Sequence, residues 1–175
     1  MLGSPNFVLG VYNGSNASAP APASVPAQPV ASNVSANGSS AVGGAAGADD
    51  ELRPWAWNND GNAFLRRLFV QWFDDRGIDY ELADFNGRSD YGPFLAAGIA
   101  AGGLDSGAEK IKSAAQRRRF GGLANAAFDP CYHQACDTLD NVHRGCLQTL
   151  SSAAAHVLQR LAEEPGLREG LAGAR

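Results

Sequence analysis

The amino-acid sequence predicts an α/β fold in which strands alternate with helices and form a parallel or mixed sheet covered on both faces. Two observations lead to this prediction. Short runs rich in β-branched and aromatic residues are typical of buried strands, and between them apolar residues recur at the spacing of an amphipathic helix. The chain has 175 residues, so one domain is its upper limit.

The first part of the chain is predicted to form a strand, an insertion and a helix. A first segment over 1–12 contains the run 6–12, which we expect to be a buried strand. Residues 13–52 are dominated by Ala, Ser, Gly, Pro, Val and Asn, bury too little apolar surface to offset their ordering entropy, and are expected to be a disordered insertion. Apolar residues recur at helical spacing over 64–73, and we expect this helix to end at Gly77.

The rest of the chain continues the alternation. We expect a strand over 78–85, a short helix over 93–97 and a strand of small residues over 98–104. The closing helix is expected over 141–163, because its apolar residues form one buried stripe and a Pro-Gly pair follows it. Residues 164–175 are expected to be a flexible tail.

The loop at 128–137, Phe-Asp-Pro-Cys-Tyr-His-Gln-Ala-Cys-Asp, carries the residue types best suited to chemistry. A ring nitrogen of His133 can ligate zinc, and the hydroxyl of the adjacent Tyr132 can donate a hydrogen bond to an oxyanion forming beside that metal. If Cys131 and Cys136 are bridged to each other, they close a short loop around both side chains, which stabilises the fold by about 2 kcal/mol.

Two simpler interpretations of this loop stay open. A lone histidine such as His133 is more often a hydrogen-bonded structural residue than a metal ligand. Alternatively, Cys131, His133 and Cys136, with or without Asp137, could ligate a single zinc ion in a reducing compartment and form a structural knuckle without catalysis. The redox state of the cysteines separates the zinc knuckle from the loop in which Cys131 and Cys136 are bridged.

Several strings in the sequence resemble a known family in both order and spacing. They are residues 1–6 (MLGSPN), 86–94 (NGRSDYGPF), 100–109 (AAGGLDSGAE) and 127–141 (AFDPCYHQACDTLDN). Together they are similar to the C-terminal part of the secreted M28 aminopeptidases, which use a co-catalytic pair of zinc ions and are typified by actinobacterial enzymes. The resemblance covers 1–12 and roughly 53–162. It implies the C-terminal portion of an α/β/α three-layer sandwich with a mixed, mostly parallel sheet, in which 53–163 forms the larger peptidase-like part.

The resemblance implies a role for each residue of the loop. His133 matches the last zinc ligand of the family, and Tyr132 matches the phenol that stabilises the tetrahedral intermediate. Cys131 and Cys136 match the disulfide that frames them. The implied cofactor is zinc, two ions in the complete family enzyme, and the implied substrates are the N-termini of peptides or proteins. We expect a monomer.

Residues outside the loop also match the family. Arg88 matches an arginine at the substrate end of the cleft, where a guanidinium can hold a carbonyl or carboxylate oxygen; without the match it would be read as a solvated loop residue. Asp90 is expected to be a buried carboxylate that orients the residues contacting the metal. Capping of the helix near Pro93 would explain Ser89 or Asp90 equally well.

The sequence also departs from the family pattern. A two-zinc hydrolase needs several His, Asp and Glu ligands and a carboxylate general base, and the segments that supply them in the family have no counterpart here. His143 and His156 lie in a helical pattern and do not replace them. We therefore expect a partial protein that is inactive by itself, either a zinc aminopeptidase represented by its C-terminal part or a catalytically inactive peptidase-like binding module. Asp105 stands where the resemblance implies an apolar or aromatic residue, which puts a preference for large apolar N-terminal side chains in doubt.

Charge and composition exclude some partners. The net charge of −4 and the absence of any basic cluster beyond the arginines at 117–119, expected as one solvated turn of helix, argue against nucleic acid. No apolar run approaches the roughly 20 residues of a membrane span, and no signal peptide is visible.

A bridge between Cys131 and Cys136 needs an oxidising compartment, so we expect the complete protein to be extracellular or in the secretory pathway. Cys146 is expected to be unpaired and buried on a helix. Asn-x-Ser triplets at Asn13, Asn16, Asn33 and Asn37 would be glycan acceptors only in a secreted eukaryotic protein.

Overall fold

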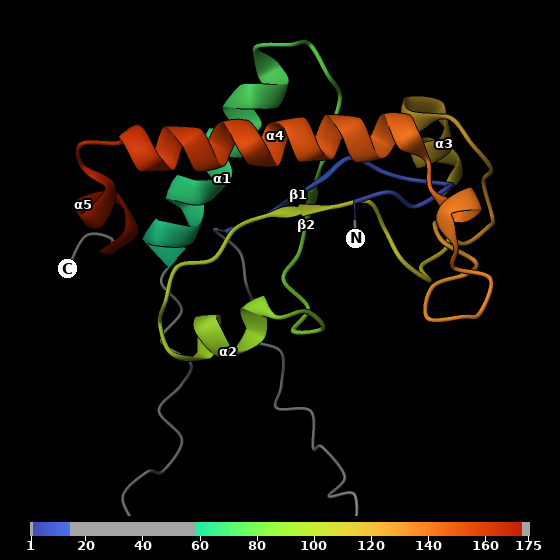
Figure 1. Cartoon of the computed structure of the whole chain (residues 1–175), viewed down its shortest axis with the longest axis horizontal. Coiled ribbons are helices and arrows are strands. Elements are labelled where there is room, and N and C mark those ends of the chain that lie inside the picture. Colours follow the sequence, from blue (N-terminus) through green and yellow to red (C-terminus); the bar gives the residue numbers. More distant parts are fainter. Residues whose placement is uncertain (1, 15–58, 173–175) are drawn as a thin grey trace, which may run out of the picture.

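The structure, a computed structural model, describes residues 2–14 and 59–172 (Figure 1). Most of the predicted insertion at 13–52 therefore lies outside the described residues, and the predicted segment boundaries stay predictions. The described residues form a mixed α/β arrangement, which confirms the predicted fold class.

The sheet has three strands in the order β2-β1-β3. The central strand β1 (Gly10–Tyr12) pairs in parallel with β2 (Glu81–Ala83) and antiparallel with β3 (Leu104–Asp105), so the sheet is mixed, as predicted. Strand β3 is shorter than the predicted 98–104. The residues before it are mainly Ala and Gly, which offer little side-chain surface to pack on a sheet.

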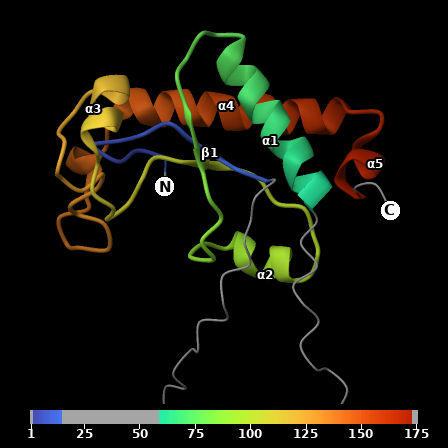
Figure 2. The ribbon, with the colours of Figure 1, turned by 180° about the vertical axis from the view of Figure 1, so that it is seen from behind.

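Helices lie on both sides of the sheet. In both views α1 (Asn59–Asp74) and α4 (Arg144–Glu163) lie on one side of the strands, and α2 (Tyr91–Ala96) lies on the other (Figures 1 and 2). The core lies between β1, β3, α1 and α4. Its buried residues are Leu9, Val11, Phe69, Trp72, Phe73, Leu104, Cys146, Leu150, Ala153 and Val157. None of the described helices is long and apolar enough to cross a membrane.

The arginine run lies in α3 (Ala114–Phe120), as the sequence predicts. Ser113 caps this helix: its hydroxyl accepts a hydrogen bond of 3.1 Å from the backbone N–H of Gln116, and the Gln116 side chain accepts one of 2.9 Å from the backbone N–H of Ser113. The arginines are exposed, and Arg119 donates two hydrogen bonds to Asp79 at 2.6 and 2.8 Å. This run is a solvated helical turn.

The closing helix begins later than its apolar stripe suggests. His143 caps α4, because its Nδ1 accepts a hydrogen bond of 3.0 Å from the backbone N–H of Cys146. The preceding residues Leu139–Asn141 form a 3-10 turn. Cys146 is buried and unpaired, as predicted, and its burial raises the pKa of the thiol to about 12.

The end of the chain differs from its prediction. Within 164–175, where the sequence predicts a flexible tail, Leu167–Ala172 form helix α5. This helix packs against α1, where Gly170 lies so close to Phe64 that a Cβ on the glycine would come within 2.9 Å of the ring. Contact with α1, which the local sequence does not reveal, accounts for the helix.

Candidate active site

Residues near the N-terminus hold the loop at 128–137 in place. The Asn6 side chain donates hydrogen bonds to the carbonyl oxygens of Leu123 at 2.9 Å and Ala127 at 3.0 Å, and the backbone N–H of Asn6 donates to Phe128 at 2.9 Å. Buried Lys112 adds a hydrogen bond of 2.7 Å from its Nζ to the Phe7 carbonyl. The segment before β1 therefore sets the position from which the loop starts.

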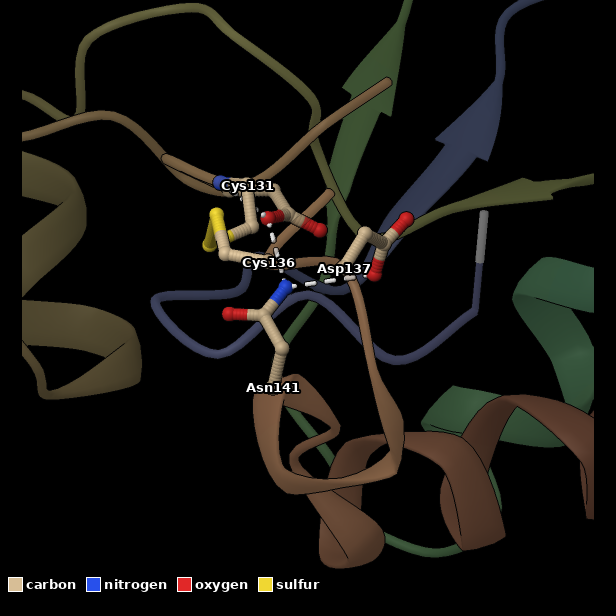
Figure 3. Close-up of a disulfide and its surroundings, with 5 residues drawn as sticks. Cys131, Cys136, Asp137 and Asn141 are labelled. Atoms are coloured by element: carbon tan, nitrogen blue, oxygen red, sulfur yellow. Dashed lines mark hydrogen bonds between the residues drawn. A yellow bond between two sulfur atoms is a disulfide. The ribbon is translucent and has the colours of Figure 1, made fainter. Parts of the chain in front are cut away.

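The loop is closed by a disulfide between Cys131 and Cys136, whose Cα atoms lie 5.3 Å apart. Inside it, the backbone N–H of Gln134 donates to the carbonyl of Cys131 at 2.8 Å, and that of Thr138 donates to Cys136 at 2.9 Å. Figure 3 shows the disulfide beside the side chains of Asp137 and Asn141. The pairing implied by the family resemblance is thus present. It contradicts the zinc knuckle, because cysteines bonded to each other cannot act as thiolate ligands.

A buried carboxylate anchors both ends of this loop. Asp129 is only 4% exposed, and its Oδ1 accepts hydrogen bonds of 2.9 Å from the backbone N–H of Cys131 and from the Asn141 amide. Asn141 also donates to Asp137 at 3.3 Å. Asp129 is not among the site residues predicted from the sequence. Its position before Pro130 was a signal, since Asp often bonds the backbone two residues on in such turns.

Tyr132 and His133 lie at the top of the loop and contact each other. Their ring centroids are 3.8 Å apart and the ring planes are inclined by 22°. Tyr132 is half-buried, whereas His133 is exposed and adopts a left-handed backbone conformation with φ of 58°. This conformation is uncommon for a residue with a Cβ, and it turns two successive aromatic side chains so that they stack.

Tyr132 faces a pocket of about 280 Å³. Arg88 lines the same pocket, so the structure brings together two of the predicted site residues that are 44 positions apart in the sequence. Tyr12 and Asp105, from strands β1 and β3, also line it. His133, Cys131 and Cys136 do not line this pocket but lie beside it in the loop that carries Tyr132.

Arg88 does not point freely into the pocket. It is exposed and forms an ion pair with Glu109, which also lines the pocket. This hydrogen bond raises the pKa of Arg88. The pKa of Glu109 is lowered, first by its own backbone N–H and then by Arg88. Glu109 could not be predicted as the partner of Arg88 from the sequence, because the contact joins two separate loops.

Asp90 differs from its prediction. It is exposed rather than buried, and it lines a separate apolar groove with Tyr91 and Phe94. It holds the N-cap position of α2 but makes no side-chain capping hydrogen bond. The expectation of a buried supporting carboxylate at Asp90 is therefore wrong, and the buried carboxylate beside the loop is Asp129.

Three aromatic rings pack together next to the pocket, and one of them, Tyr12, lines it. Tyr12 stacks on Phe85 with ring centroids 4.9 Å apart, and Tyr91 meets Tyr12 edge-on at 5.1 Å. Burial, followed by the nearby Asp105 carboxylate, raises the pKa of Tyr12 well above its usual value. The Tyr91 hydroxyl accepts hydrogen bonds from the backbone N–H groups of Asn86 at 2.8 Å and Gly87 at 3.1 Å, which holds the loop that carries Arg88.

The described residues do not form a metal site by themselves. Within 2–14 and 59–172, no group of three or more His, Cys, Asp and Glu side chains could hold a metal ion. The exposed imidazole of His133 can supply one ligand, whereas zinc in proteins is usually held by three or four.

Comparison with known proteins finds a family model and several aminopeptidases that are similar to this chain. The family model for peptidase family M28 matches residues 45–158. Leucine aminopeptidase 2 from Arthroderma otae is 40% identical over 102 residues, which are 58% of this chain and 21% of that protein. An aminopeptidase from Pseudomonas aeruginosa is 42% identical over 97 residues, covering 55% of this chain and 18% of that protein.

A third relative extends the match to another group of bacteria. The probable lipoprotein aminopeptidase LpqL from Mycobacterium tuberculosis is 41% identical over 112 residues, 64% of this chain and 22% of that protein. The chain thus spans about a fifth of the length of these relatives.

Proposed function

This chain belongs to peptidase family M28, and from that premise we propose that it forms the part of a zinc-dependent aminopeptidase that carries one metal ligand, the phenol of Tyr132 and a substrate pocket. The substrates are the N-termini of peptides or proteins. The observation that carries this proposal is the position of Tyr132, which faces a pocket shared with Arg88 and stacks on His133.

Tyr132 is suited to stabilise the transition state of peptide hydrolysis. Attack on the peptide carbonyl turns its oxygen into an oxyanion, and a hydroxyl held in place can donate a hydrogen bond to that oxygen. The disulfide and the buried Asp129 hold the backbone on both sides of Tyr132, so little reorganisation is needed when the charge develops.

Arg88 is proposed to bind a carbonyl or carboxylate oxygen of the substrate. Its guanidinium is paired with Glu109 in an exposed position, where ion pairs contribute little stability and exchange readily. A substrate oxygen can therefore compete with Glu109 for one N–H of Arg88 while the pair stays in contact.

His133 is proposed as one zinc ligand. A single imidazole is not a zinc site, so a zinc-dependent enzyme needs further ligands and a general base besides those that the described residues supply. We propose an extracellular or secretory location, which the disulfide supports because such bonds persist in oxidising compartments.

A second candidate is a catalytically inactive peptidase-like binding module. The absence of a metal-binding cluster among the described residues favours it. Such a module would bind peptides in the pocket at Tyr132 without hydrolysing them.

Kinetics and zinc content test the proposal. The chain alone, with zinc added, is expected not to hydrolyse leucyl or methionyl chromogenic amides. In a longer protein that combines this chain with the remaining ligands, His133→Ala is expected to lower zinc content and activity together. Tyr132→Phe should keep the zinc and lower kcat by roughly 10² to 10³, with little change in KM.

His156→Ala, in α4, is the matched control and is expected to leave zinc content unchanged. Unchanged zinc content and activity in His133→Ala would overturn the assigned ligand, and full activity in Tyr132→Phe would remove the phenol from the mechanism. Binding of peptides by the longer protein without any turnover would favour the inactive module.

A further inference from the structure

The pocket at Tyr132 carries an excess of negative charge. Four carboxylates line it, from Glu81, Asp84, Asp105 and Glu109, against two cationic side chains. The cationic side chains are Arg88 and Lys110. A cation would be attracted to such a lining.

The carboxylates differ in how far they are already engaged by the protein. Glu109 is paired with Arg88. Glu81 accepts a hydrogen bond of 2.8 Å from the Gln116 side chain and lies 3.9 Å from the Arg119 guanidinium. In the part of the chain that the structure describes, Asp105 is hydrogen-bonded only through Oδ1, which accepts from the backbone N–H of Gly107 at 3.1 Å.

Asp105 is half-buried in β3, an outer strand of the sheet. It ends strand β3, where it pairs with Gly10 of β1, and a Cβ on Gly10 would lie 3.4 Å from the Asp105 Cβ. The pocket beside it is lined by the buried side chains of Val8 and Phe128. A pocket that has both a carboxylate and apolar side chains in its lining suits a substrate side chain with methylene groups and a cation at its end.

We propose that Asp105 makes this pocket selective for substrates whose first residue is lysine or arginine, by pairing its carboxylate with the cation of that side chain. The inference rests on the proposed function, because it assigns the pocket to the first residue of a peptide. The proposed preference for a cationic first residue differs from the one that the name of the relative leucine aminopeptidase 2 refers to, since leucine is apolar.

Binding of two small probes to this chain tests the inference without any need for catalysis. L-Lysinamide and L-norleucinamide share an unbranched side chain, but only the former ends in a cation. Both are titrated into the chain at low salt while backbone NMR signals around Asp105 and Tyr132 are followed. We expect lysinamide to bind about five- to ten-fold more tightly, the size of one partly screened ion pair.

Two variants identify the carboxylate responsible. Asp105→Asn keeps the size of the side chain, removes its charge and is expected to abolish the preference for lysinamide. Asp75→Asn removes the same charge from an exposed turn outside the pocket and is expected to retain the preference. Any of three results would overturn the inference. Norleucinamide binds as tightly as lysinamide or more tightly, Asp105→Asn keeps the full preference for lysinamide, or the NMR signals respond to neither probe.

The test of this selectivity and the test of the proposed function can give different results. In one outcome, the longer protein hydrolyses leucyl and lysyl amides at equal rates, with no effect of Asp105→Asn. This result would support the aminopeptidase activity and overturn the proposed selectivity. A lysinamide preference that depends on Asp105, in a longer protein that hydrolyses nothing, would support the selectivity and overturn the activity.

Discussion

The Asn141 amide donates a hydrogen bond of 2.9 Å to the buried carboxylate of Asp129 and thereby links the two ends of the loop that carries Tyr132 and His133. The same Asp129 oxygen accepts from the backbone N–H of Cys131 at 2.9 Å. One carboxylate therefore holds the start of the loop against its end, next to the disulfide.

Loss of this acceptor should destabilise the protein. Asp129→Ala leaves two donors without their partner and is expected to lower the free energy of unfolding by about 1–3 kcal/mol, measured by urea denaturation. Asp129→Asn should cost less, because an amide oxygen can still accept both bonds. Asp137→Ala, at the exposed second acceptor of Asn141, should change stability by less than about 0.5 kcal/mol. Equal losses in Asp129→Ala and Asp129→Asn would contradict this account.

The redox state of the cysteines can be read directly. When protein from an oxidising host is unfolded and alkylated without reduction, mass spectrometry should find Cys146 alkylated and the peptides of Cys131 and Cys136 joined. Prior reduction should label all three cysteines and lower stability by about 2 kcal/mol, because the short loop is no longer closed in the unfolded chain. Recovery of both Cys131 and Cys136 as alkylated thiols without reduction would disprove the bridge.

The buried Cys146 thiol should make stability depend on pH in the alkaline range. Burial raises its pKa from 9.0 to about 12, so between these values the folded chain keeps a proton that the unfolded chain has lost. Unfolding then releases a proton, and the free energy of unfolding contributed by this group falls as pH rises, by up to about 1.4 kcal/mol per pH unit.

Urea denaturation at pH 8.5, 9.5 and 10.5 checks the sign. Cys146→Ala should show a shallower decline than the native protein, even though the smaller side chain lowers stability at every pH. The other groups that titrate in this range are present in both proteins. A decline of equal steepness in both would show that the thiol does not titrate as its burial implies.

Gly107 next to the pocket should not tolerate a side chain. Its φ is 85°, and a Cβ would lie 2.4 Å from Phe128 Cγ, so Gly107→Ala combines backbone strain with a steric clash. We expect a loss of about 3 kcal/mol in thermal or urea unfolding. Gly77→Ala is the matched control, because its φ is 60° but no atom lies within 4 Å of the added Cβ. It should cost only about 1 kcal/mol, and equal losses at the two sites would rule out the clash.

Much of the local structure could be predicted from the sequence. The strand around Val11, the helix that ends near Gly77 and the buried face of α4 follow from hydrophobic periodicity, which is encoded within a few neighbouring residues. The pairing of Cys131 with Cys136 could also be predicted, from the family resemblance of the loop at 128–137, and the disulfide confirms it. The roles of Tyr132 and His133 stay predictions.

Only the tertiary structure decided which side chains share the pocket. The pairing of Arg88 with Glu109, the exposure of Asp90, the burial of Asp129 and the approach of α5 to α1 all depend on how separate elements pack. The position of Asp105 beside Tyr12 has the same origin, since Gly10 of β1 and Asp105 of β3 are paired across the sheet although they are 95 positions apart in the sequence. Periodicity specifies which face of an element is buried, but the partner on that face is set by long-range packing, which local sequence does not encode.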